Sequence, residues 1–141
     1  MTETITETSN KKLSAGIVVV RKFEGQWLFL MLRAYNYWDF PKGQVEEFEG
    51  TMEAAKRETA EETGLEDLEF KWSAKYRETK QYGKKKVARY YLASTEDEEV
   101  IISEEHHEFA WLSFSDALNI SGERQKDVLY WAHGLIDDDE W

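Results

Sequence analysis

The sequence predicts an α/β sandwich, in which a β-sheet packs against a central helix and a C-terminal helix. Two apolar runs, residues 13–23 and 27–32, flank Glu24-Gly25 and are rich in the side chains of buried strands. Residues 51–64 have the composition of a helix, and apolar side chains recur at helical spacing near the C-terminus. The length of 141 residues suits one domain, which we expect over residues 13–136, between a flexible leader (1–12) and an acidic tail (137–141).

Three more strands are expected after the central helix. In each, aromatic, aliphatic or β-branched residues predominate or alternate with polar ones, and a turn separates the first two. They cover residues 68–78, 87–93 and 109–114, with the turn at 81–86.

The remaining elements follow from a few individual residues. Pro41 blocks regular structure, so residues 35–43 are expected to form a loop that leads toward the central helix. Ser115 is expected to cap a short helix after the last strand. The final helix has one apolar face, which consists of Val128, Leu129, Ala132 and Leu135.

The central helix carries three carboxylates on one face. Thr51 is a candidate N-cap and Gly64 a natural stop, and Glu58, Glu61 and Glu62 are spaced i, i+3 and i+4 between them. Like charges at this spacing weaken a helix, and a divalent cation bound between them reverses that effect. Carboxylates are the oxygen ligands that Mg²⁺ or Mn²⁺ prefers, although an acidic helix face that only contacts water would look the same.

The wider spacing resembles the signature box of the Nudix hydrolases. Over 23 residues, a glycine, four glutamates, an arginine, a second glycine and an aliphatic residue stand at the family's positions. Phe48 and Thr59 depart from the general pattern, because the family commonly has glycine and an aliphatic residue there. The resemblance implies a mixed sheet between helices, an α/β/α sandwich with a loop–helix–loop catalytic motif. The matching residues are Gly43, Glu49, Arg57, Glu58, Glu61, Glu62, Gly64 and Leu65.

The resemblance also implies roles for these residues. Glu58, Glu61 and Glu62 are expected to hold Mg²⁺, or Mn²⁺, together with the carbonyl of Gly43. Glu61 either completes the metal site or takes a proton from the attacking water, and the choice of general base stays open. Glu49 is expected to reach the same site, held there by an ion pair with Arg57, and a plain surface salt bridge is the alternative.

Residues outside the box extend the candidate site. Lys42 lies on the constrained loop and is expected to contact a phosphate, although an ordinary loop lysine is as compatible with the sequence. In related enzymes a glutamate before the last strand completes the catalytic site, and Glu105 matches it better than Glu104. His106 is expected to contact substrate or to be ordinary surface.

A narrower resemblance concerns the substrate. The segments W-D-F-P-K-G and E-E-H-H-E-F-A-W, together with Thr59, look like the asymmetric diadenosine tetraphosphate hydrolases. That resemblance implies cleavage of this dinucleoside polyphosphate to ATP and AMP. Phosphate contacts are expected from Lys86 and Tyr90, and adenine stacking from Tyr82 and Phe109. The alternatives are a solvated hairpin tip for the lysine and ordinary sheet core for the tyrosines and the phenylalanine. Hydrolysis of RNA 5′ triphosphate ends or another nucleoside polyphosphate, or a non-catalytic nucleotide-binding module, are the alternatives.

Composition excludes several other classes of protein. The net charge of −11 argues against a large electrostatic footprint for DNA, and RNA is not expected as a partner either. The chain has no cysteine, which excludes disulfides and thiolate metal sites and fits a reducing cytoplasm. It has no apolar run long enough for a membrane span and no secretory signal. Nothing in the sequence indicates an oligomeric state.

Overall fold

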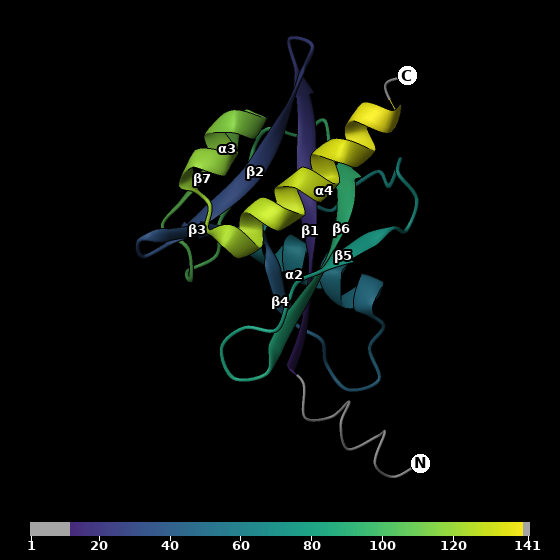
Figure 1. Ribbon diagram of the computed structural model, residues 1–141, viewed down its shortest axis with the longest axis vertical. Helices are drawn as coiled ribbons and strands as arrows, with labels where there is room; N and C mark the ends of the chain where they lie inside the picture. Colours follow the sequence, from purple (N-terminus) through teal and green to yellow (C-terminus); the bar gives the residue numbers. More distant parts are fainter. Residues whose placement is uncertain (1–11, 140–141) are drawn as a thin grey trace.

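The computed structural model describes residues 12–139 of the chain (Figure 1). Seven strands and three helices follow one another along these residues. They are β1 (Lys12–Phe23), β2 (Gln26–Ala34), β3 (Tyr37–Asp39), β4 (Lys42–Gln44), α2 (Thr51–Thr63), β5 (Tyr76–Glu78), β6 (Lys86–Ser94), β7 (Glu108–Leu112), α3 (Phe114–Ile120) and α4 (Glu123–Asp139).

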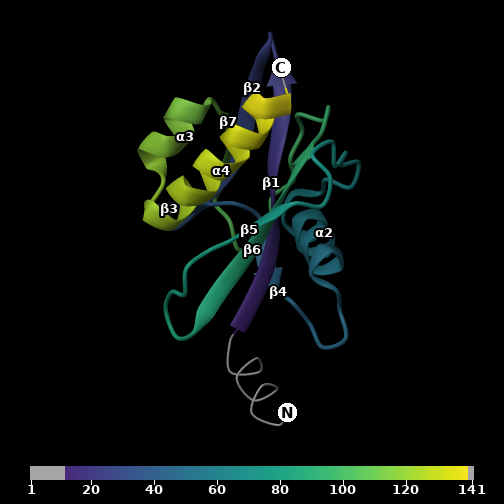
Figure 2. The ribbon, with the colours of Figure 1, turned by 45° about the vertical axis from the view of Figure 1, so that its right-hand side comes forward.

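The strands form one mixed sheet between two helical layers. Strand order is β3-β2-β1-β6-β5, with β4 added to β1 and β7 added to β2. The long central pair β1 and β6 is parallel, and the other pairs are antiparallel. Figure 2 shows α2 on one face of the sheet and α3 and α4 on the other, so the predicted α/β/α sandwich is confirmed.

Alternate residues of β1 supply both halves of the core. Ile17 and Val19 belong to the cluster that packs α2 against the sheet, whereas Val18 and Val20 belong to the cluster under α4. All four are fully buried, which explains why this strand reads as a continuous apolar run. The helix α2 therefore packs against a strand whose central residues are buried on both faces.

The segment predicted as a loop, residues 35–43, contributes two short strands. β3 pairs with β2 and β4 pairs with β1, and Phe40 and Pro41 separate them. The crossing is close, because a Cβ at Gly16 would lie 2.2 Å from the carbonyl oxygen of Pro41. The glycine on β1 thus lets the loop reach across the strand and bring Lys42 toward α2.

The predicted ends of the helices need small corrections. Gly50, not Thr51, is the N-cap of α2, and its N–H donates to the Glu53 carboxylate (3.0 Å). The Thr51 hydroxyl instead bonds the Tyr91 hydroxyl (2.6 Å), which fixes the start of the helix to β6. Gly64 ends the helix in a left-handed conformation, as predicted. Ser113 caps α3 in place of Ser115, so the preceding strand also ends earlier than predicted.

The strand predicted over residues 68–78 is wrong. Only an isolated bridge at Glu69 and the three residues of β5 pair with β6. Between them the chain turns, with the Ser73 N–H donating to the Phe70 carbonyl and Ser73 itself at φ 61°. Trp72 is buried against Trp27, so part of the apolar alternation comes from a loop that inserts a side chain into the core.

At both termini, regular secondary structure extends beyond the predicted domain limits of residues 13 and 136. Lys12 already belongs to β1, and the rest of the predicted leader lies outside the described residues. The predicted acidic tail continues α4 as far as Asp139. No helix among residues 12–139 combines the length and apolar character needed to cross a membrane.

Candidate active site

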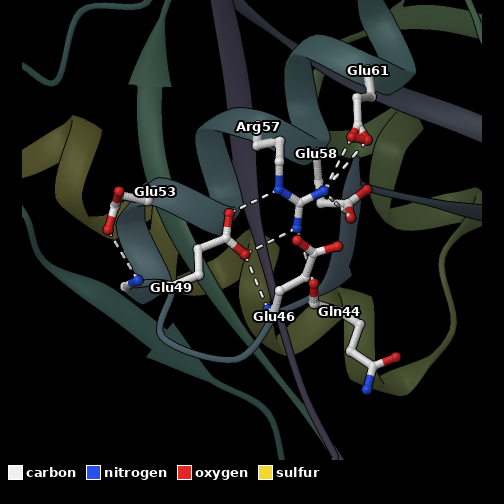
Figure 3. Close-up of polar contacts among 8 residues, drawn as sticks. Gln44, Glu46, Glu49, Glu53, Arg57, Glu58 and Glu61 are labelled. Carbon is white, nitrogen blue, oxygen red and sulfur yellow. Dashed lines mark hydrogen bonds and ion pairs between the residues drawn. The ribbon is translucent and has the colours of Figure 1, made fainter.

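Arg57 is the centre of the polar network at the start of α2 (Figure 3). Its Nε and Nη2 donate to the two carboxylate oxygens of Glu49, at 2.8 and 3.0 Å. Its Nη1 donates to Glu58 (2.9 Å) and to Glu61 (3.0 Å). The expected pairing of Arg57 with Glu49 is confirmed, and the same guanidinium also neutralises two of the carboxylates predicted to hold metal.

A tight turn presents Glu49 to Arg57. The Glu49 N–H donates to the Glu46 carbonyl, and the Glu46 N–H donates back to the Glu49 carboxylate, both at 3.0 Å. Hydrogen bonds from Arg57 and from the Glu46 backbone lower the pKa of Glu49, so it stays ionised. Phe48 occupies the left-handed position of this turn, at φ 67°, where the family commonly has glycine.

Glu58 lies directly against the backbone of Gly43. A Cβ added at Gly43 would meet the carboxyl carbon of Glu58 at 2.0 Å. Burial raises the pKa of Glu58, and the charges of Glu61 and Glu105 act in the same direction, whereas Arg57 opposes the shift. The structure therefore brings Gly43 and Glu58 together, as the sequence predicted.

Glu62 is the most perturbed carboxyl group of the site. Its side chain is buried where α2 faces the segment that carries Lys42, and its Oε1 accepts the backbone N–H of Lys42 (3.2 Å). Burial, reinforced by Glu58 and Glu105, raises the pKa of Glu62 to about 8. A buried carboxyl group beside two others is stabilised by protonation or by a cation.

The loop before β7 faces this cluster. Glu105 is an exposed residue whose charge acts on both Glu58 and Glu62, and Glu104 is not among the groups that do so. The His106 Nε2 lies 4.0 Å from Glu62, and its Nδ1 contacts the Ser103 hydroxyl at 3.3 Å. Glu105 and His106 thus join the carboxylate cluster from a different part of the chain.

The donor chemistry of the cluster fits a hard divalent cation. Glu58, Glu61 and Glu62 offer only oxygen, and the glycine at position 43 lets backbone and carboxylate approach closely. Within residues 12–139, however, no three acidic or histidine side chains converge as a ready-made set of ligands. Arg57 engages Glu58 and Glu61 here and supplies their counter-charge.

Lys42 reaches a polar position beside the carboxylates. Its Nζ lies 3.6 Å from the carboxylate of Asp39, a buried residue that sequence reasoning missed. Burial alone would lower the pKa of Lys42, but Asp39, Tyr82, Tyr37 and Glu62 together raise it. The ammonium group is therefore charged and lies at the junction of the carboxylates and the tyrosines.

Tyr90 lies in the core beside Asp39 and is not exposed at the candidate site. It is 1% exposed, its ring packs on Phe40, and its hydroxyl donates to Asp39 (3.3 Å). The structure therefore gives no support to the predicted phosphate contact of Tyr90, which stays a prediction. Its contact with Asp39 connects it instead to the residue that positions Lys42.

Tyr82 and Phe109, the two predicted stacking residues, lie on opposite faces of the sheet. Tyr82 packs against the cluster under α4, whereas Phe109 packs against the cluster under α2. Phe109 is half-buried against the cluster under α2. Lys86 begins β6 and is exposed, with its backbone paired to that of Tyr82.

A cavity of about 580 Å³ opens between Tyr82 and the start of α4. Arg124 lines it and lies over the Tyr82 ring, 3.8 Å from the ring centroid. Sequence reasoning missed Arg124, because only the tertiary fold brings α4 to the 79–82 segment. The cavity is lined by Arg77, Glu78, Thr79, Lys80, Gln81, Tyr82, Gly122, Glu123, Arg124, Gln125 and Asp127.

Comparisons with known proteins agree with this geometry. The model of the NUDIX domain matches residues 10–132. Two proteins named bis(5′-nucleosyl)-tetraphosphatase [asymmetrical] are each 35% identical, one from Caenorhabditis elegans (77% of this chain and 83% of that protein) and one from Rattus norvegicus (77% and 80%). The crystal structure of a C. elegans Ap4A hydrolase binary complex superimposes with a TM-score of 0.81 at 30% identity, covering 90% of this chain and 98% of the other.

Proposed function

The chain belongs to the Nudix family of hydrolases, and from this we propose that it cleaves diadenosine tetraphosphate asymmetrically, to ATP and AMP, with Mg²⁺. The relatives that carry the corresponding name cover most of this chain, and it covers most of them. Family membership alone indicates a hydrolase, and the substrate and products are our proposal.

One observation carries the proposal: three kinds of group lie side by side. The carboxylates of Glu58 and Glu62 adjoin Lys42 through the hydrogen bond between Glu62 and the Lys42 backbone. Lys42 in turn lies within electrostatic range of Tyr82, which lines the cavity. A metal-binding surface, a phosphate-binding cation and an aromatic platform are the elements that a nucleoside polyphosphate requires.

The carboxylates have distinct proposed roles. Glu58, Glu61 and Glu62 would hold Mg²⁺, with the Gly43 carbonyl beside them, and Mn²⁺ suits the same donors. The bound ion supplies charge neutralisation for the polyphosphate and lowers the pKa of water. Glu49 keeps Arg57 in place, and Glu105 faces Glu58 and Glu62 from the opposite loop, where a carboxylate can accept a proton from the attacking water.

Lys42 and Lys86 are the proposed phosphate contacts. The ammonium of Lys42 pairs with Asp39 in the free protein, and an incoming phosphate offers it a stronger anionic partner. Lys86 lies at the start of β6, beside the hairpin that carries Tyr82. A polyphosphate bound between the carboxylates and the cavity would meet the ammonium of Lys42, which lies near both Glu62 and Tyr82.

A substrate panel tests the proposal. With Mg²⁺, diadenosine tetraphosphate should be cleaved to ATP and AMP faster than ATP, a diadenosine with a shorter phosphate chain, or RNA with a 5′ triphosphate end. Glu58→Gln should lower kcat by about 100-fold or more without unfolding the protein. Faster cleavage of the RNA would reject the proposed substrate, and equal rates for Glu58→Gln and the unchanged protein would reject the proposed metal site.

A further inference from the structure

Arg124 differs from the other arginines of the site in having no anionic partner. Arg57 pairs with three glutamates, and Arg77 pairs with both oxygens of Asp127. Among the described residues, Arg124 makes neither a hydrogen bond nor an ion pair, and its Nε is buried without an acceptor. Its guanidinium instead lies over the face of the Tyr82 ring in a cation–π contact.

An arginine without a carboxylate is unexpected in this chain. The sequence has 29 acidic and 18 basic residues, so carboxylates are abundant on the surface. Glu123 and Asp127 both line the same cavity on the same helix, yet Asp127 pairs with Arg77. The guanidinium is thus left with unused donors at the wall of a cavity, which points to a ligand that supplies acceptors or a π-face.

The contact with Tyr82 identifies the kind of ligand. A guanidinium at 3.8 Å from a ring centroid occupies the position that a stacked aromatic ring would take. Because no carboxylate holds Arg124, its side chain can move away from Tyr82 by the thickness of one ring. The guanidinium is planar and delocalised, so it stacks on a base as well as on a tyrosine, which an ammonium group does not do.

We propose that Arg124 is a specificity-determining residue that stacks on a nucleobase of the substrate. In the free protein it lies on Tyr82, and on binding the base inserts between the guanidinium and the Tyr82 ring. This inference rests on the proposed function, because it requires a nucleotide in the cavity beside Lys42. It adds a residue on α4 that recognises the base. None of the site residues predicted from the sequence lies on that helix.

The test compares two ligands that differ only in the base. AMP and ribose 5-phosphate share the ribose and the phosphate, and neither contains a phosphoanhydride, so binding is measured without hydrolysis. Dissociation constants are measured by NMR titration, with the signals of Tyr82 as the reporter. The variants are Arg124→Ala, Arg124→Lys and Arg124→Tyr, and Lys126→Ala is the control because Lys126 is a cation on the same helix that does not line the cavity.

We expect AMP to shift the signals of Tyr82 in the unchanged protein. Arg124→Ala and Arg124→Lys should each weaken AMP by about ten-fold, because both remove a stacking group. Arg124→Tyr should retain affinity to within about three-fold, since an aromatic ring can replace the guanidinium. Ribose 5-phosphate should bind all four proteins equally, and Lys126→Ala should match the unchanged protein with both ligands.

Four results would overturn the inference. Unshifted Tyr82 signals at millimolar AMP would exclude the base from the cavity. Arg124 would be assigned to a phosphate contact by two results together: AMP affinity in Arg124→Lys equal to that of the unchanged protein, and weaker binding of ribose 5-phosphate in Arg124→Ala. Tighter AMP binding in Arg124→Ala would make Arg124 an obstacle, and unchanged AMP binding would make it structural. Failure to hydrolyse diadenosine tetraphosphate would reject the proposed function without changing any of these binding results.

Discussion

The guanidinium of Arg57 donates to both carboxylate oxygens of Glu49, at 2.8 and 3.0 Å, across eight residues of sequence. This bidentate pair connects the loop before α2 to the helix itself. Because the remaining nitrogen of Arg57 contacts Glu58 and Glu61, the position of one arginine decides how three carboxylates are arranged.

Replacing Arg57 tests this arrangement. Arg57→Lys keeps the charge but loses the planar fork, so Glu49 and Glu58 can no longer be held together. We expect kcat to fall by about 100-fold, the cost of a small misplacement of catalytic groups, with little change in Tm. Steady-state kinetics and thermal unfolding measure the two effects.

Arg33→Lys is the matched control, because Arg33 makes an ion pair with Glu108 away from the carboxylates of α2. Its kcat should stay within about two-fold of the unchanged protein, as expected for a surface ion pair. Equal losses in both variants would mean that Arg57 has no special role.

Glu62 makes the metal-free protein sensitive to pH. Its folded-state pKa of about 8 lies above the unfolded value, so between these values the folded state binds the extra proton. Stability therefore falls as pH rises from about 5 to 8. Glu62→Gln removes this loss, and we expect it to raise the unfolding free energy by about 2 kcal/mol at pH 8 in EDTA while abolishing activity.

Denaturant unfolding at pH 5 and pH 8 measures this effect. Glu66→Gln serves as the control, because Glu66 is exposed beyond the end of the helix and should leave the pH dependence unchanged. A Glu62→Gln variant that is less stable than the unchanged protein at pH 8 would show that Glu62 is ionised and well solvated there.

Two glycines with opposite surroundings give a paired prediction. Gly43→Ala places a Cβ 2.0 Å from the Glu58 carboxyl carbon, which should displace that side chain, lower stability by about 1–3 kcal/mol and lower kcat. Gly134→Ala, in the interior of α4 with nothing within 4 Å, should instead stabilise the protein by about 0.5–1 kcal/mol. Chemical denaturation of both variants measures the contrast, and similar stabilities would contradict it.

Phe48 is a strained position that should tolerate change. Its φ of 67° favours glycine, and its side chain is 99% exposed, so it gains nothing from burial. Phe48→Gly should raise stability by about 1 kcal/mol. Phe48→Ala removes the aromatic ring but keeps the strain, so it should remain close to the unchanged protein; an equal gain in Phe48→Ala would rule out the backbone explanation.

The parts of the site that sequence predicted are local to one segment. Gly43, Glu49, Arg57 and Glu58 lie within 16 residues, and helix geometry together with the spacing of the box was enough to predict that they meet. The accessibility of residues on the strands depends instead on strand register. Tyr90 is buried because of the face of β6 on which it falls, a property that short alternating runs do not fix.

The residues that were missed depend on tertiary contacts. Arg124 has no neighbours in sequence that mark it as functional, and it gains its role from Tyr82, more than 40 residues earlier. Asp39 lies within the segment W-D-F-P-K-G, but its burial beside Tyr90 depends on the fold. The strand wrongly predicted at 68–78 has the same origin. The apolar residue at position 72 packs on Trp27 from a loop. Its place among polar neighbours gives an alternation that resembles a strand.

The central claim is that the carboxylates of α2, Lys42 and the Tyr82 cavity act together on one dinucleoside polyphosphate. The most direct measurement is product analysis of diadenosine tetraphosphate with Mg²⁺ in ¹⁸O-labelled water. We expect ATP and AMP in equal amounts, with the label in only one of them, and no products from Glu58→Gln. Formation of two ADP molecules, or no cleavage under conditions where the protein is folded and binds Mg²⁺, would contradict it.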